Sequence, residues 1–471
     1  MTHLTLLTIF CLAQIAVGVA IGRRVRSTSD FFVAGRRLGP AMLFSTMVAA
    51  NIGAGSTVGA AGYGYRDGLS AWWWVGSAAI GSIVLAWWVG PRIRRLAEAH
   101  DLQTLGDFLE WRYDWRVRAA ATSLLWLGTL MILAGQLLAL SFVLEAVAGW
   151  PRWVGCLTGG AVMTIYFTAG GMLSTIWVNL VQLVVLLVGF GLAMPYAFGA
   201  VGGWQGLRQV TDSAGPYWSL WRGGGSGWIF LAMLGPSFFL SPGLLQKVYG
   251  ARDDRAVRIG VLANAGVLFA FAFVPVLLGM IARALHPGLV NRELALPMLL
   301  VDDLPLTIGS LGLAALVAAE ISTADAILFM LSTSLSRDLY QRFVRPGAAD
   351  GDVLRVARIT SVVAGVAGVT LAILVTKAVA DALGFFYTLL SVSLFVPVVG
   401  GLFWPRLGAG PALGAMLVGV LVAAAAQFVF PAALPPAVTP AMVGIAAGAT
   451  AALAGVLATG ARVVESRSPA P

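Results

Sequence analysis

Long apolar runs recur along the whole chain, and they constrain its fold more than any other feature. A helix that crosses the hydrocarbon core of a bilayer needs about 20 mostly apolar residues. Charged residues make up only 11% of the chain, whereas a typical soluble domain carries about 25%. The sequence therefore predicts an all-α integral membrane protein, with about thirteen spans at 4–22, 38–65, 69–90, 117–148, 153–170, 173–198, 228–249, 257–284, 306–336, 354–377, 382–404, 411–430 and 440–460.

Basic residues are distributed unevenly between the two sides of such a protein. If the N-terminus lies outside, 23 of the 30 Lys and Arg residues fall on the inner side. Cytoplasmic loops of membrane proteins are enriched in Lys and Arg. We therefore expect a multi-pass protein of a bacterial-type inner (plasma) membrane, with its N-terminus outside and its C-terminus in the cytoplasm. This topology explains the net charge of +9, so we expect no nucleic-acid partner and no obligate protein partner.

Glycine and proline interrupt two of the predicted spans. Five glycines crowd residues 53–64 of the second span, and Pro236 and Pro242 lie within the seventh. Such interruptions survive in a membrane only where they face protein or a water-filled cavity, although the glycines of the second span could also simply permit close helix packing. A pair of interrupted spans in corresponding halves is typical of a transporter binding site.

The two interrupted spans each open a set of five spans, and sets of five insert with opposite polarity. The sequence therefore predicts a five-plus-five inverted-repeat core with broken first and sixth core helices. The expected parts are an extra N-terminal helix at 1–28, a first repeat at 29–198, an outer loop at 199–227, a second repeat at 228–406, and two C-terminal helices with a short cytoplasmic tail at 407–471.

The ninth span carries oxygen-bearing side chains on one face. Ala319, Ser322 and Thr323 share a helix face because they are spaced i, i+3, i+4. Two hydroxyls and a carbonyl suit a hard monovalent cation, and carbonyls of a broken helix could complete its shell. The alternative is that both hydroxyls only bond back to their own helix.

Two acidic residues, Glu320 and Asp325, lie in the same span. Ionisable residues inside a membrane are rare and mark functional sites by default. Asp325 follows Ser322 by three residues, whereas Glu320 points to a different side of the helix. Each could take part in proton or cation coupling, or could pair with a buried arginine or hydroxyl.

Four segments resemble the sodium:solute symporter family of sodium/proline, sodium/sugar and sodium/pantothenate carriers. They are Asp30–Pro40, Thr104–Tyr113, Glu320–Tyr340 and Leu402–Gly419, in the family's order and spacing. The resemblance implies the five-plus-five fold and sodium as the coupling ion. It also implies a sodium site between the first and eighth core helices, formed by carbonyls of Ala49, Ile52 and Ala319 and hydroxyls of Ser322 and Thr323.

Residues for the solute also follow from the resemblance. The matching positions are Asn51, Ser56, Thr57, Trp73, Trp74, Ser241, Pro242, Tyr387 and Leu389. The tryptophans could instead belong to an interfacial aromatic belt. Few of these positions carry the polar side chains that sugar carriers use for hydroxyl groups, which disfavours a sugar.

One position departs from the family pattern. Asn179 stands where relatives often carry an acid that helps an ion to pass or to bind a second time. The chain is thus predicted to be a cation-coupled symporter, most simply with sodium, that imports an amino acid or a small carboxylate. A proton-coupled symporter and a transporter-like solute sensor are the alternatives, a channel is disfavoured, and we expect no enzyme because no catalytic motif is present.

Overall fold

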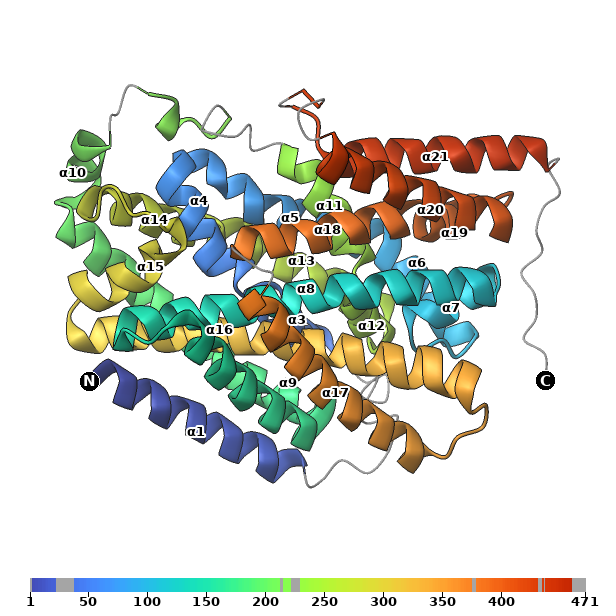
Figure 1. Ribbon diagram of the computed structural model, residues 1–471, viewed down its shortest axis with the longest axis horizontal. Helices are drawn as coiled ribbons and strands as arrows, with labels where there is room; N and C mark the ends of the chain where they lie inside the picture. Colours follow the sequence, from blue (N-terminus) through green and yellow to red (C-terminus); the bar gives the residue numbers. More distant parts are fainter. Residues whose placement is uncertain are drawn as a thin grey trace.

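The structure is a computed structural model that describes residues 2–22, 38–211, 215–221, 229–374, 378–430, 434–435 and 437–459. Apart from one isolated bridge between Leu38 and Ala251, the regular elements in these ranges are helical. Most helices run along one common axis (Figure 1), and α1 begins and α21 ends at opposite ends of the bundle. The basic cluster of residues 23–37 and the C-terminal tail lie outside the described ranges.

The first half of the bundle follows an N-terminal helix, α1 (Thr2–Gly22). Its elements are α3 (Pro40–Asn51), η2 (Gly55–Gly59), α4 (Ala60–Asp67), η3 (Gly68–Ala71), α5 (Trp72–Val84), η4 (Leu85–Val89), α6 (Gly90–Ala99), α7 (Leu105–Arg112), α8 (Trp115–Ala148) and α9 (Arg152–Ala200). The predicted outer loop contains α10 (Gly203–Val210) and η5 (Pro216–Trp218).

The second half opens with α11 (Ile229–Leu240) and α12 (Pro242–Tyr249). It continues with α13 (Asp254–Phe271), α14 (Phe273–Leu285), η6 (Arg292–Leu294), α15 (Ala295–Met298), η7 (Leu299–Asp303), α16 (Leu306–Thr333), η8 (Ser334–Val344), α17 (Asp350–Leu374), α18 (Val379–Leu394), η9 (Phe395–Val399) and α19 (Gly400–Phe403). Two helical segments follow, α20 (Ala409–Ala424) with η10 (Ala425–Val429), and α21 (Pro440–Ala458).

Ten stretches of the described chain are long and apolar enough to cross a membrane, compared with the thirteen spans that we predicted. Three predicted spans account for the difference: α1 counts only as a shorter apolar helix, the second and third spans share the stretch Gly55–Ala99, and the fifth span is not a separate stretch. The second predicted span is divided, so that α3 alone has 12 residues. The fifth and sixth predicted spans form one helix of 49 residues, α9, which continues through residues 171–172, where the prediction had separated them.

The first broken helix divides after Asn51. Ile52 takes an extended conformation, and the chain resumes as the π-helical turn η2 at Gly55. A Cβ atom on Gly53 would collide with the Thr323 side chain and lie 2.8 Å from Oε1 of Gln136. Glycine is therefore required at this position because α8 and α16 approach the backbone of the break closely.

The second broken helix divides at Ser241, between α11 and α12. Ser241 leaves the helical conformation, and Pro242 is the first residue of α12. Proline is favoured at this helical position because its missing N–H would have no partner there. Pro236, in contrast, lies inside α11 without ending it, so only one of the two prolines marks the break.

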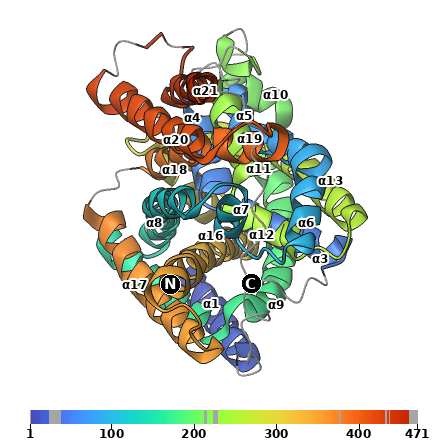
Figure 2. The ribbon, with the colours of Figure 1, turned by 90° about the vertical axis from the view of Figure 1, so that its right-hand side faces the viewer.

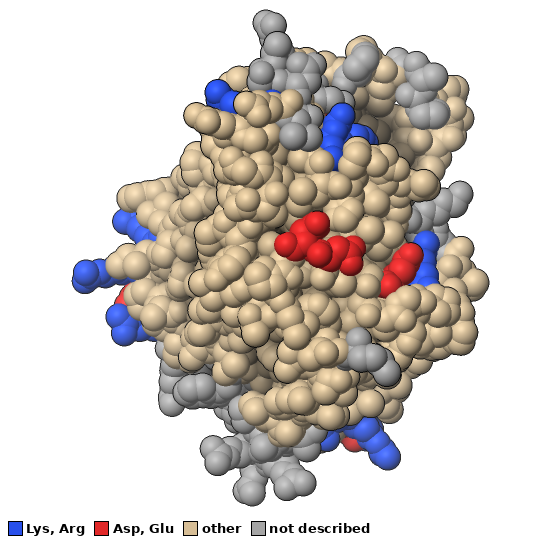
Figure 3. All heavy atoms as spheres, turned by 90° about the vertical axis from the view of Figure 1, so that its left-hand side faces the viewer, with Lys and Arg blue, Asp and Glu red and all other residues tan. Residues whose placement is uncertain are grey.

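The two breaks lie beside the most buried helix of the bundle. Of the apolar part of the α16–η8 stretch, 89% is buried, compared with 33% in α20–η10 and 28% in α21. Seen end on, α16 lies among α8, α9 and α12, while α20 and α21 lie at the periphery (Figure 2). The opposite end of the bundle shows few charged side chains (Figure 3).

Candidate cation and solute site

Oxygen atoms from α3 and α16 converge where α3 ends. The Ser322 hydroxyl lies 2.9 Å from the carbonyl oxygen of Ala49 and 3.0 Å from that of Ala319. The Thr323 hydroxyl lies 3.0 Å from the carbonyl oxygen of Ile52. All five residues with predicted sodium-binding oxygens thus belong to one cluster.

This cluster has the chemistry of a site for a hard monovalent cation. Such ions take oxygen ligands, and a hydroxyl oxygen offers lone pairs once its proton turns away. Ser322 bonds both to Ala319 of its own helix and to Ala49 of α3, and Thr323 reaches across to Ile52 at the end of α3. Bonding within the helix therefore does not account for the pair, and a bound cation would replace the hydrogen bonds that now join the two helices.

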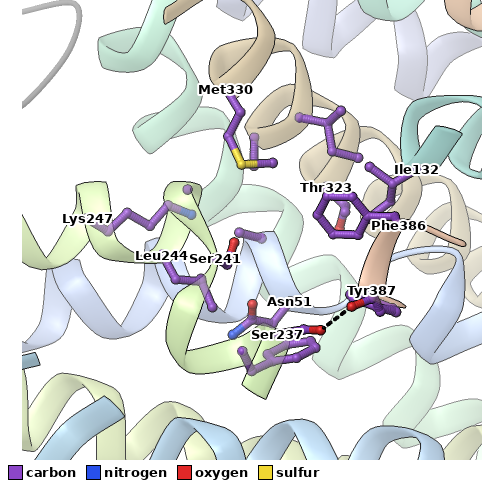
Figure 4. Close-up of a pocket in the computed structure, with 15 residues that line it drawn as sticks. Asn51, Ile132, Ser237, Ser241, Leu244, Lys247, Thr323, Met330, Phe386 and Tyr387 are labelled. Carbon is purple, nitrogen blue, oxygen red and sulfur yellow. Dashed lines mark hydrogen bonds between the residues drawn. The ribbon is translucent and has the colours of Figure 1, made fainter. Parts of the chain in front are cut away.

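Two adjoining chambers lie next to the cluster. Both are lined by Ala50, Asn51, Ile132, Phe238, Thr323 and Tyr387. The chamber that we call the first also has Gly53, Gly55, Ser56, Trp74, Val75, Ala78, Gln136, Leu234 and Leu383. The second chamber has Ser237, Ser241, Gly243, Leu244, Lys247, Ala326, Ile327, Met330 and Phe386, several of which Figure 4 shows around its space.

The structure places the predicted solute residues in two groups. Asn51, Ser56, Trp74, Ser241 and Tyr387 line the chambers. Asn51 also donates a hydrogen bond to the side chain of Asn264, and Trp74 donates one to the carbonyl oxygen of Gly55. The hydrogen bond to Asn264 of α13 orients the Asn51 amide, and the hydrogen bond to Gly55 of the first broken helix orients the Trp74 indole.

The remaining predicted solute residues lie elsewhere. The Trp73 indole donates to the carbonyl oxygen of Leu220 and packs against Trp221, away from the chambers. Pro242 lines a third chamber, together with Met330, Thr333 and Asp338. Thr57 is fully buried and bonds to the break itself, and Leu389 packs close to Gly128.

Sequence reasoning missed Gln136 and Lys247. The Gln136 side chain is 1% exposed, and its Oε1 accepts a hydrogen bond from the backbone N–H of Ala54. It thus satisfies one of the backbone groups that the break frees. Gln136 could have been found as a polar side chain in the middle of the apolar run 117–148. Such side chains commonly form hydrogen bonds with neighbouring helices in a membrane.

Glu320 lies on the η2 side of the same break. The Thr57 hydroxyl lies 2.8 Å from Oε1 of Glu320 and 2.8 Å from the carbonyl oxygen of Gly53. A hydroxyl has one proton to donate. If that proton goes to Gly53, then Glu320 must donate its own, so a neutral carboxylic acid fits both contacts.

Asp325 and Asn179 are two buried polar side chains with oxygens that lack hydrogen-bond partners among the described residues. Asp325 is fully buried, and neither of its oxygens has a hydrogen-bond partner among the described residues; the same holds for Oδ1 of Asn179. A Cβ atom on Gly189 of α9 would lie 2.7 Å from the carbonyl oxygen of Leu311 in α16. The helix that carries Asn179 therefore packs directly against the helix that carries Asp325.

A network of charged side chains lies beyond the third chamber. The Arg118 guanidinium contacts Asp107 at 3.0 Å, Glu110 at 2.9 Å and Asp338 at 2.6 Å. Burial alone would raise the pKa of Glu110, but hydrogen bonds from Arg342 and Arg118 lower it. The network joins α7 and the start of α8 to η8, the continuation of α16.

A helical membrane bundle with two broken helices, an oxygen cluster at one break and buried chambers beside both defines a secondary transporter. Residues 31–419 match the sodium:solute symporter family. The chain therefore belongs to that family, as its motifs predicted.

Relatives and solved structures agree with this assignment. The sodium/pantothenate symporter of Escherichia coli is 28% identical over 437 residues, which cover 86% of each chain. The sodium/iodide cotransporter of Homo sapiens is 25% identical over 87% of this chain and 63% of its own.

The solved structures show the same fold. A Na+-coupled sialic acid symporter in a substrate-bound outward-open state superposes with a TM-score of 0.83, at 19% identity over 98% of this chain and 99% of that one. Mhp1, a nucleobase-cation-symport-1 family transporter, gives 0.56 at 16% identity, over 91% and 95%. The all-α fold with broken core helices is thus confirmed.

Proposed function

We propose that this protein is a sodium-coupled symporter that imports a small organic solute by alternating access. Sodium would bind to the oxygens of Ala49, Ile52, Ala319, Ser322 and Thr323, and the solute would occupy the two adjoining chambers. We assign residues 29–198 and 228–406 to the two inverted repeats, in a bacterial plasma membrane with the N-terminus outside.

The convergence of carbonyl and hydroxyl oxygens at the end of α3 is the observation that supports this proposal most directly. Thr323 both belongs to this cluster and lines the two chambers. A cation bound there would therefore fix the helix break that forms one wall of the solute space. Binding of the ion and of the solute would stabilise the same arrangement, which is the coupling that a symporter needs.

Uptake into proteoliposomes tests the proposal. A radiolabelled panel of amino acids, small carboxylates and iodide is offered with a sodium gradient, a proton gradient or neither. We expect at least one solute to accumulate with the sodium gradient alone. Accumulation that needs only the proton gradient would favour proton coupling, and sodium-dependent binding without accumulation would indicate a solute sensor.

Glu320→Gln tests whether uptake is coupled to protons. This alternative is considered because Glu320 is a buried acid in contact with the Thr57 hydroxyl. An amide can donate to Thr57 as a neutral acid does, so we expect the variant to keep sodium-driven uptake within about twofold, with an unchanged pH profile. Glu320→Ala, which removes the donor, serves as the comparison and should reduce uptake. A flattened pH profile in the Gln variant would make Glu320 a proton carrier.

Asp325 is the acid that we propose for cation passage, in place of the acid missing at Asn179. Burying a charged carboxylate without a partner costs free energy unless a cation binds next to it. We therefore expect Asp325→Asn to slow sodium-driven uptake about tenfold, and Asn179→Asp alone to change the sodium-to-solute ratio or the exit rate. Combining the two substitutions should restore part of the uptake, and a double variant as slow as Asp325→Asn would assign Asp325 a structural role.

A further inference from the structure

The chambers contain one charged side chain, Lys247, whose role sequence reasoning did not foresee. It belongs to α12, six residues beyond the break at Ser241, and its side chain remains partly accessible. Figure 4 shows its ammonium group directed toward the second chamber, on the side of Met330 and Ser241. The charge therefore lies at the edge of the space that the solute would occupy.

Within the part of the chain that the structure describes, no acidic side chain pairs with this charge. Among the described residues, no carboxylate oxygen lies within 4.0 Å of the Lys247 nitrogen, and the residues that line the first and second chambers include no aspartate or glutamate. The ammonium group donates a hydrogen bond of 2.6 Å to the carbonyl oxygen of Thr46 in α3. An ammonium group has three donors, so a bound group could receive the others.

Two acids on elements near Lys247 are paired with arginines, whereas Asp325 of α16 has no hydrogen-bond partner among the described residues and makes no ion pair with Lys247. Asp254 contacts Arg94 on the side of α6. Asp338 contacts Arg118 on the side of α7 and α8. Charges inside membrane proteins are normally paired or face a water-filled path. Because none of these acids contacts Lys247, a mobile anion is a candidate partner for its charge.

The rest of the second chamber indicates what kind of anion fits. The cavity has a volume of about 50 Å³, which admits only a small solute. Its apolar lining includes Ile132, Phe238, Leu244, Met330 and Phe386, and its polar side chains besides Lys247 are those of Asn51, Ser237, Ser241, Thr323 and Tyr387. The N-terminal end of α12 also faces this chamber at Ser241, and such helix ends favour negative charge.

We propose that the second chamber binds the carboxylate of a small monoanionic organic solute through Lys247, with the solute's carbon skeleton against the apolar lining. This inference rests on the proposed symport function and narrows its solute class. Without an acidic side chain in either chamber, a zwitterionic amino acid would lack a charged partner for its ammonium group. A carboxylate without that group is therefore preferred.

Thermal unfolding of the purified protein in saturating sodium tests this inference. A ligand that binds the folded state raises the melting temperature with its concentration. The probes are acid and amide pairs: propanoate and propanamide, lactate and lactamide, benzoate and benzamide, together with alanine and iodide. We expect at least one acid to stabilise the protein at concentrations tenfold or more below those needed by its amide.

Lys247→Met and Lys247→Arg provide the matched variants. Methionine keeps the length and packing of the side chain without its charge, so we expect the preference for the acid to disappear while stabilisation by sodium alone persists. Arginine keeps the charge and should retain a preference for the acid. Sodium stabilisation of Lys247→Met shows that the variant is folded and that the cation cluster is intact.

Several results would overturn the inference. They are an amide that binds as well as its acid, stabilisation by iodide or alanine but by none of the acids, no stabilisation by any probe, and an unchanged acid preference in Lys247→Met. These outcomes are separate from the symport proposal. Sodium-driven uptake of a neutral solute would leave symport standing and remove the carboxylate site, whereas acid binding without sodium-driven uptake would do the reverse.

Discussion

Replacing Ser322 and Thr323 together by alanine is expected to raise the sodium concentration for half-maximal uptake about tenfold or more. The double change removes both hydroxyl oxygens from the cluster and leaves the carbonyls of Ala49, Ile52 and Ala319 in place. A tenfold loss corresponds to about 1.4 kcal/mol of binding free energy, a modest estimate for two of five ligands. Uptake measured over a range of sodium concentrations reads the effect directly.

The same helix offers a matched control. Ser332 and Thr333 form a second buried Ser-Thr pair, ten residues further along α16. Their hydroxyls lie 3.0 Å and 2.8 Å from the carbonyl oxygen of Phe329, within their own helix. Their double alanine variant should leave the sodium dependence unchanged, and an equal shift in both double variants would remove sodium from the proposed site.

The fold was largely predictable because its signals are local. Runs of apolar residues, and glycines or a proline within such a run, reveal spans and breaks from neighbouring residues alone. The sequence did not predict that the helix breaks before Pro242 and continues through Pro236, since both prolines disturb a helix in the same way. The outcome depends on tertiary packing around Ser241, and the sequence does not contain that information in readable form.

The site was predictable only where residues share a helix. Ser322 and Thr323 follow from spacing, but their approach to Ala49 and Ile52 came from the family resemblance. The contact between Gln136 and Ala54 joins residues 82 positions apart. Lys247 was counted as one of many basic residues that set the topology, because nothing in its neighbours shows that its side chain reaches a chamber.

The Arg118 network leads to the second prediction. Arg118→Met should destabilise the protein by about 3–5 kcal/mol, because removal of one partner leaves buried carboxylates without their counter-charge. Asp338 suffers most, since it is 5% exposed and its other given partner is the hydroxyl of Thr104. We also expect uptake to fall, because α8 would lose its ion pair with η8 next to the third chamber.

In Arg118→Met, a loss of stability and an opening of the third chamber have to be measured separately. A variant in which Cys11 and Cys156 are replaced and Thr333 becomes cysteine reports access to the third chamber through its rate of thiol labelling. We expect Arg118→Met to speed labelling about tenfold. Arg345→Met, which breaks an exposed ion pair with Asp352, is the control and should change stability by less than about 1 kcal/mol.

Neutralising Asp338, which Arg118→Met leaves without a counter-charge, shows whether the Arg118–Asp338 ion pair closes the third chamber or only stabilises the fold. Asp338→Asn added to Arg118→Met removes the unpaired buried charge and should recover much of the melting temperature. Labelling of the cysteine at position 333 should nevertheless stay fast, because the contact between α8 and η8 is still missing. If the double variant regained both stability and slow labelling, the network would serve folding alone. Persistent fast labelling in a stable protein would show that Arg118 holds this end of the transport path closed.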